Sequence, residues 1–148
     1  MAHAVMGAYL YHFLQLVDWP NSGRSGAMNL CVLGDESFAE SLAPITSKKV
    51  HDRSIQLITS LKSPSAANDC QVLYLGDEHH TYIPDYLNAT KSQPVLTVSN
   101  LPDFSKTGGM IEFVELQGRV RFILNTRQAK SNGFHLSSKI LELAAETL

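Results

Sequence analysis

Two cysteines are the side chains of this sequence with the most specific chemistry. Cys31 and Cys70 each lie near the start of a short apolar run, at 29–33 and 70–75, that predicts a buried strand. Neighbouring strands lie about 4.8 Å apart, within the Cα separation of about 4.4–6.8 Å that a disulfide accepts. Free cysteines are also among the residue types most often buried. The residues alone leave two alternatives open: a disulfide, which would indicate an oxidising compartment, or two buried thiols.

A second group of candidate residues is acidic and follows the ends of predicted strands. Asp35 and Glu36 follow the first strand, Asp77 follows a later one, and Ser99 ends the next. In outline this resembles the carboxylate cluster of phospho-acceptor receiver domains, where paired acids hold Mg²⁺. A receiver would also place a lysine beyond a fifth parallel strand, where this chain offers a hairpin instead. Ordinary turn and helix-capping carboxylates are the other interpretation.

Two arginines alternate along a predicted strand near the C-terminus. Arg119 and Arg121 point to one face of that strand, while Val120 and Phe122 point to the other. The pair predicts either a contact with an anion or a protein partner, or a solvated sheet face. Glu112, on the preceding strand, could pair with these arginines.

Other catalytic or ligand-binding signatures are missing from the sequence. The 6 histidines form no zinc-binding spacing with a partner, and there is no Gly-x-Ser-x-Gly nucleophile motif. The only glycine pair, Gly108-Gly109, belongs to neither a P-loop nor a dinucleotide fingerprint. We therefore expect no metal, no cofactor and no catalysis, and a role in binding.

The elements that position these residues follow from the hydrophobic periodicity and the turn residues. Ser37 and Glu40 have the spacing of a capping box that opens a helix toward residue 45, whereas 63–68 is predicted to be a surface loop. Helices are predicted at 4–17, 37–45, 82–89, 125–132 and after Ser137, and a helical turn at 101–107. Strands are predicted at 29–33, 54–61, 70–75, 94–98, 110–116 and 119–124.

The strands alternate with helices, and most are apolar throughout. This pattern predicts an α/β fold, a single-domain sandwich over residues 1–148 with a mostly parallel central sheet and helices on both faces. The runs on either side of Gln117-Gly118 should form a C-terminal antiparallel hairpin. Ligands of open sheets favour the carboxyl ends of the strands, which places Gly34-Asp35, Gly76-Asp77 and Ser99-Asn100 at the expected site.

Composition narrows the class of protein further. The chain has 148 residues, 44% hydrophobic and 18% charged, with a formal net charge of −2. That balance argues against nucleic acid as a partner, and no apolar run is long enough to cross a bilayer. No Lys or Arg precedes the apolar stretch 4–17, so we interpret it as a helix of the fold rather than as a signal peptide. The protein is then either cytosolic, or its signal peptide was removed before this numbering begins.

Ordered motifs run along nearly the whole chain. They are YLYHF (9–13), VDWP (17–20), LCVLGD (30–35), CQVLYL (70–75), PVLTVS (94–99), GGMIEF (108–113), GRVRF (118–122) followed by Asn125, and LSSKIL (136–141). Together they resemble the YfiR-like periplasmic regulators, also met as HmsC-type proteins in biofilm operons.

The resemblance implies a domain exported to the periplasm, its signal peptide removed. Such a domain restrains a membrane-anchored diguanylate cyclase by binding its periplasmic region, which lowers cyclic-di-GMP and biofilm formation without catalysis. It also implies a homodimer, and sequestration of the regulator by an outer-membrane lipoprotein. Cys31 and Cys70 match the family's cysteines, which implies that they form a disulfide. The cysteines of a second disulfide, found in the best-known member, are absent here.

The residues proposed to contact a partner or ligand are Trp19, Arg119, Arg121, Asn125 and Lys139. An alternative function is a sensor whose cleft, near the strand ends and Trp19, takes a small aromatic or nucleotide-like molecule. A further alternative is a receiver-like phospho-acceptor domain that uses Asp35, Glu36 and Asp77.

Overall fold

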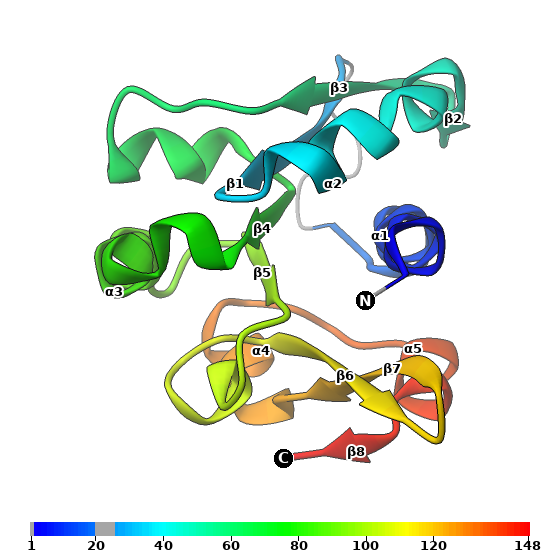
Figure 1. Cartoon of the computed structure of the whole chain (residues 1–148), viewed down its shortest axis with the longest axis vertical. Coiled ribbons are helices and arrows are strands. Elements are labelled where there is room, and N and C mark those ends of the chain that lie inside the picture. Colours follow the sequence, from blue (N-terminus) through cyan, green and yellow to red (C-terminus); the bar gives the residue numbers. More distant parts are fainter. Residues whose placement is uncertain (1, 20–25) are drawn as a thin grey trace.

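The computed structural model describes residues 2–19 and 26–148 and shows an α/β fold (Figure 1). Its α-helices are α1 (His3–Leu16), α2 (Glu36–Ser41), α3 (Ile83–Ala89), α4 (Thr126–Ser131) and α5 (Ser138–Leu143). Short 3-10 helices are η1 (Ala43–Ser47), η2 (Pro64–Asp69), η3 (Asp77–Tyr82) and η4 (Phe104–Lys106). The strands are β1 (Met28–Leu33), β2 (Lys49–Val50), β3 (Arg53–Ile58), β4 (Val72–Leu75), β5 (Leu96–Ser99), β6 (Ile111–Leu116), β7 (Arg119–Leu124) and β8 (Glu146–Thr147).

The strands form one mostly parallel sheet in the order β2-β3-β1-β4-β5-β6-β7-β8. Strands β3, β1, β4, β5 and β6 run parallel, whereas β6 and β7 form the predicted antiparallel hairpin. β6 is thus both the fifth parallel strand and the first strand of the hairpin, so the chain turns back where a receiver would carry its lysine. Every residue of β4 and β5 is buried, as expected for strands covered on both faces.

Helices cover both faces of the sheet, as predicted. One face carries an apolar cluster that includes Met6 and Phe13 of α1, Phe38 of α2 and Ile140 of α5. The other face carries a second cluster, to which Ile83 of α3, η2 and η4 contribute. In Figure 1, α1 and α3 accordingly lie on opposite sides of the central strands.

The first helix is anchored on the hairpin by aromatic packing. The ring of Phe13 stacks on Phe113 with centroids 6.4 Å apart and meets the edge of Phe122 at 5.1 Å. The Tyr9 hydroxyl donates a hydrogen bond to the Val120 carbonyl at 3.2 Å. These contacts explain why the apolar stretch near the N-terminus is part of the fold.

Two local predictions need correction. The helix after β1 is capped by Asp35, whose Oδ1 accepts from the Phe38 backbone N–H at 3.0 Å, and not by Ser37. Asp35 is separated from the strand by Gly34 alone, and its side chain reaches an N–H in the first turn of the helix, so no later cap is needed. Residues 64–69, predicted as a loop, form the 3-10 helix η2, with Pro64 in its first turn, where a missing N–H is tolerated.

Candidate functional site

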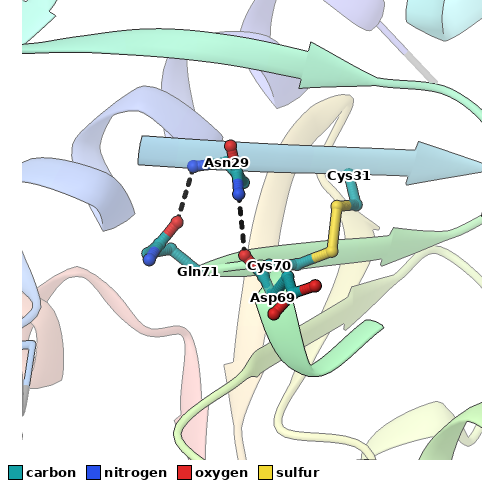
Figure 2. The surroundings of a disulfide bond; sticks show 5 residues. All are labelled: Asn29, Cys31, Asp69, Cys70 and Gln71. Atoms are coloured by element: carbon teal, nitrogen blue, oxygen red, sulfur yellow. Dashed lines mark hydrogen bonds between the residues drawn. A yellow bond between two sulfur atoms is a disulfide. The ribbon is translucent and has the colours of Figure 1, made fainter. Parts of the chain in front are cut away.

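Cys31 and Cys70 form a disulfide, with their Cα atoms 6.0 Å apart (Figure 2). Cys31 lies in β1, and Cys70 lies between η2 and β4, the neighbouring parallel strand. Both cysteines are buried within the apolar cluster on the α3 face. The disulfide predicted from the resemblance is therefore confirmed, and the buried-thiol alternative is excluded.

Hydrogen bonds also connect β1 with the segment before β4, the two segments that the disulfide links. The Asn29 side-chain amide donates to the Asp69 carbonyl at 2.9 Å, and the Asn29 backbone N–H donates to the Gln71 side-chain oxygen. Figure 2 shows these bonds beside the sulfur bridge, between β1 and the segment that leads into β4. The two segments are thus also held together by hydrogen bonds that do not depend on the sulfur atoms.

The predicted acidic and hydroxyl residues lie at or just beyond the carboxyl ends of β1, β4 and β5, where local contacts occupy several of them. Asp35 caps α2, and Asp77 begins η3. The Glu36 backbone N–H donates to the Glu78 carboxylate at 3.4 Å. The hydroxyl of Ser99 donates to the Leu75 carbonyl.

A receiver-like domain needs a cluster of acidic side chains that holds a metal ion and a lysine beyond the fifth parallel strand. Across residues 2–19 and 26–148, no group of three or more His, Cys, Asp or Glu side chains is placed to hold a metal ion. The residues that follow β6, the fifth parallel strand, are Gln117 and Gly118, where a receiver would carry its lysine. The receiver-like alternative is thus supported only by the positions of Asp35, Glu36 and Asp77 after the strands.

One buried polar group near these strand ends is unusual. Tyr74 in β4 is fully buried against Phe38, with ring centroids 4.8 Å apart, and its hydroxyl has no hydrogen-bond partner in the described part of the chain. Burial is the main cause that raises the pKa of Tyr74, and the negative charges of Asp35 and Asp77 add to it. The tyrosine is therefore held in its neutral form.

A groove between α1 and α5 brings other candidate residues together. Its volume is about 500 Å³, and its walls are mainly apolar. The lining residues are Val5, Ala8, Tyr9, His12, Leu16, Lys139, Glu142 and Leu143. Val5 and Leu143 are 42% and 39% exposed and line the same groove, so their apolar surfaces are part of one exposed patch. We call this surface the α1/α5 groove.

One of the two hairpin arginines lies beside this groove. Arg121 donates to the backbone carbonyl of Leu143 at 3.4 Å, and Lys139 lines the groove itself. Arg119 is exposed at the start of β7, opposite Leu116 in the hairpin register. Val120 belongs to the apolar cluster on the α1 face, so the alternating arginine side chains start from the other face of β7. The structure therefore brings Arg121 and Lys139 to this apolar surface.

The expectation that Glu112 could pair with these arginines was wrong. Glu112 is opposite Ile123 in the hairpin register, whereas Arg121 is opposite Val114. The Glu112 carboxylate is buried and accepts from the N–H and hydroxyl of Ser105, at 3.0 and 2.8 Å. It therefore secures η4 to the sheet, a role that strand alternation could not reveal.

The other two predicted contact residues have internal partners. The indole N–H of Trp19 donates to the Leu14 carbonyl at 3.0 Å, and its ring, only 6% exposed, meets the edge of Phe134. Asn125 caps α4 by accepting from the Gln128 N–H, and its amide donates to Ser105. A contact of either side chain with a partner or ligand stays a prediction.

Several groove residues were not singled out in the sequence. Val5, Ala8 and Leu16 lie within the apolar stretch 4–17, which was predicted only as a helix of the fold. Only their position beside α5 shows that they line a surface rather than the core. The apolar character of α1 on more than one side was the one available signal, because a helix that only covers a sheet needs one apolar stripe.

Among the described residues, no helix is both long and apolar enough to span a membrane. Comparison with known proteins identifies the family of the chain. No curated protein matches the chain. A family model described as YfiR/HmsC-like, however, matches residues 3–145, which include every described helix and every described strand except β8. The chain therefore belongs to the YfiR/HmsC-like family.

Proposed function

We propose that this chain is a periplasmic, non-enzymatic regulator that binds the periplasmic region of a membrane-anchored diguanylate cyclase. Binding stabilises the inactive arrangement of the cyclase and so lowers cyclic-di-GMP and biofilm formation. The observation that carries this proposal is the YfiR/HmsC-like match over residues 3–145. The Cys31–Cys70 disulfide supports the compartment, because such bonds persist in oxidising environments.

The α1/α5 groove is the surface that we propose contacts the cyclase. It combines exposed apolar side chains, Val5 and Leu143, with the cationic groups of Lys139 in its lining and of Arg121 beside Leu143. Protein interfaces commonly surround an apolar centre with a polar rim, and arginine is enriched in them. The partner surface that fits this pattern carries an apolar projection flanked by acidic residues. Homodimer formation and an outer-membrane lipoprotein partner remain predictions.

The experiment that tests the regulatory role measures cyclic-di-GMP in cells with and without the gene. Deletion should raise the cyclic-di-GMP level, and expression of the wild-type chain should lower it again. An unchanged level after deletion would overturn the proposed function.

Two matched variants test the groove. Leu143→Glu places a charge in the groove, whereas Leu141→Glu places the same charge on α5 at a residue outside the groove's described lining. The two leucines are 39% and 38% exposed, so we expect similar, small effects on folding. Only Leu143→Glu should fail to lower cyclic-di-GMP, with both proteins present at equal levels by immunoblot. Equal activity of the two variants would refute the groove as the contact surface.

A further inference from the structure

The order of the parallel strands identifies a second place where this fold can bind a molecule. From β1 the chain passes to β3 through α2, on the α1 face of the sheet. From β3 it returns past β1 to β4 through η2, and it leaves β4 through α3, both on the opposite face. The strand order therefore reverses between β1 and β4. Open α/β sheets bind ligands in the crevice beyond the carboxyl ends of such strands.

A cavity lies at this reversal point, on the α3 face. Its volume is about 390 Å³, within the range of about 300–1,000 Å³ that is typical of small-molecule sites. Its lining residues are Leu33, Gly34, Thr59, Ser60, Leu61, Lys62, Ser63, Pro64, Leu75, Gly76, Tyr82, Ile83 and Tyr86. Leu33 and Leu75 are the last residues of β1 and β4. We call this space the β1/β4 cavity.

Two glycines bring the chain segments after β1 and β4 into direct contact beside this cavity. A Cβ atom on Gly76 would lie 2.4 Å from the Gly34 carbonyl oxygen, so only glycine permits this approach. The Gly76 N–H also donates to the Leu33 carbonyl at 2.7 Å. The wall of the cavity is therefore built from backbone held in place by the sheet rather than from a loose loop.

The lining of the β1/β4 cavity indicates the chemistry of its ligand. Leu33, Leu75 and Ile83 supply apolar walls, and Tyr82 and Tyr86 supply aromatic rings. Among the lining residues that the structure describes, Lys62 is the one with a full charge, and it neighbours the hydroxyl groups of residues 59, 60 and 63. An apolar, aromatic body with an anionic group matches this distribution.

Four acidic residues, Asp35, Glu36, Glu40 and Glu78, line a second cavity of about 500 Å³, which shares Gly34 and Thr59 with the β1/β4 cavity. Their charges would repel an anion from that second cavity. We propose that the β1/β4 cavity binds a small aromatic carboxylic acid, whose ring lies among the leucine, isoleucine and tyrosine side chains and whose carboxylate faces Lys62. This site is separate from the α1/α5 groove, so its failure would leave the proposed regulatory function untouched.

The test measures binding of 2-naphthylacetate and its neutral analogue 2-naphthylacetamide by two-dimensional amide NMR. Saturable shifts should cluster at Gly34, Gly76 and Tyr86 and leave α1 and α5 unchanged. An exposed ion pair is worth up to about 1 kcal/mol, so the acid should bind about two- to fivefold more tightly than the amide. No saturable shift at millimolar concentration, or shifts centred on the α1/α5 groove, would overturn the proposal.

Three variants separate the charge from the cavity. Lys62→Gln should abolish the preference for the acid over the amide, whereas Lys91→Gln, an exposed lysine outside the cavity lining, should retain it. Ser60→Trp at the exposed rim should fill the cavity and remove binding of both compounds while the amide spectrum stays folded. Unchanged binding in Ser60→Trp, or the same preference in Lys62→Gln and wild type, would overturn the proposal.

Discussion

Reduction of the Cys31–Cys70 disulfide should destabilise the protein without unfolding it. The bridge joins residues 39 positions apart, and in the chain-entropy model a loop of that length is worth about 4 kcal/mol. A typical domain has an unfolding free energy of about 5–15 kcal/mol, which exceeds this loss, so the reduced protein should stay folded. The hydrogen bonds from Asn29 to Asp69 and Gln71 should keep β1 and β4 in register after reduction.

Urea unfolding followed by tryptophan fluorescence measures this loss. Trp19 is the single tryptophan, and its buried ring against Phe134 should report loss of the core. Because both sulfur atoms are buried, the protein should be reduced while unfolded and then refolded in reductant. At an m-value of about 1–3 kcal/mol per molar urea, the midpoint should fall by roughly 1.3–4 M.

The double variant Cys31→Ala/Cys70→Ala supplies the control, because reductant should leave its unfolding curve unchanged. A reduced wild type within about 1 kcal/mol of the oxidised protein would refute the view that the bridge acts by restricting the unfolded chain. A similar effect of reductant on the double variant would show that the loss does not arise from the bridge.

Three further substitutions test the two glycine positions and the buried tyrosine. Gly76→Ala should lower the free energy of unfolding by about 3 kcal/mol, because the new Cβ meets backbone atoms of Gly34. Gly118→Ala, with open space around it and only a positive φ of 75° to disfavour it, should lose about 1 kcal/mol; equal losses in urea would contradict this reading. Tyr74→Phe should stabilise the protein by about 1 kcal/mol at neutral pH, because it removes a buried hydroxyl without a partner among the described residues. Since burial raises the pKa of Tyr74 above its ordinary value of 10.0, its contribution to stability is complete below that pH. Above it, stability should fall by up to about 1.4 kcal/mol per pH unit, and a Tyr74→Phe curve of the same slope would disprove the assignment.

The central elements of the fold were predictable because their sequence signals are local. The runs that became β1, β4 and β5 are apolar on both faces, a pattern that a doubly covered parallel strand requires. The hairpin was equally predictable, because Gln117 and Gly118 separate two runs with strand patterns. In the structure both residues adopt the positive φ that a tight turn between β6 and β7 demands.

The edges of the sheet and the proposed binding surfaces could not be predicted, because they depend on contacts between residues that are far apart in the sequence. Strands β2 and β8 have two residues each, too few for any periodic pattern, and exist only because β3 and β7 present open edges. Glu112 alternates like a surface residue, yet η4 folds over it and binds its carboxylate. The α1/α5 groove was hidden for the same reason, because its two helices are more than 100 residues apart in the chain.

The disulfide and the β1/β4 cavity lie on one face of the sheet and the α1/α5 groove on the other, which determines how the two proposed sites could influence each other. Cys31 shares its apolar cluster with Leu33, Leu75 and Ile83, three residues that line the β1/β4 cavity. The α1/α5 groove instead rests on the cluster around Phe13 and Phe113, on the opposite face. Because β1 and β4 contribute to both clusters, any movement at the disulfide reaches the cavity directly and the groove only through the sheet. A ligand in the cavity would therefore affect partner binding only if it shifts these two strands relative to α1.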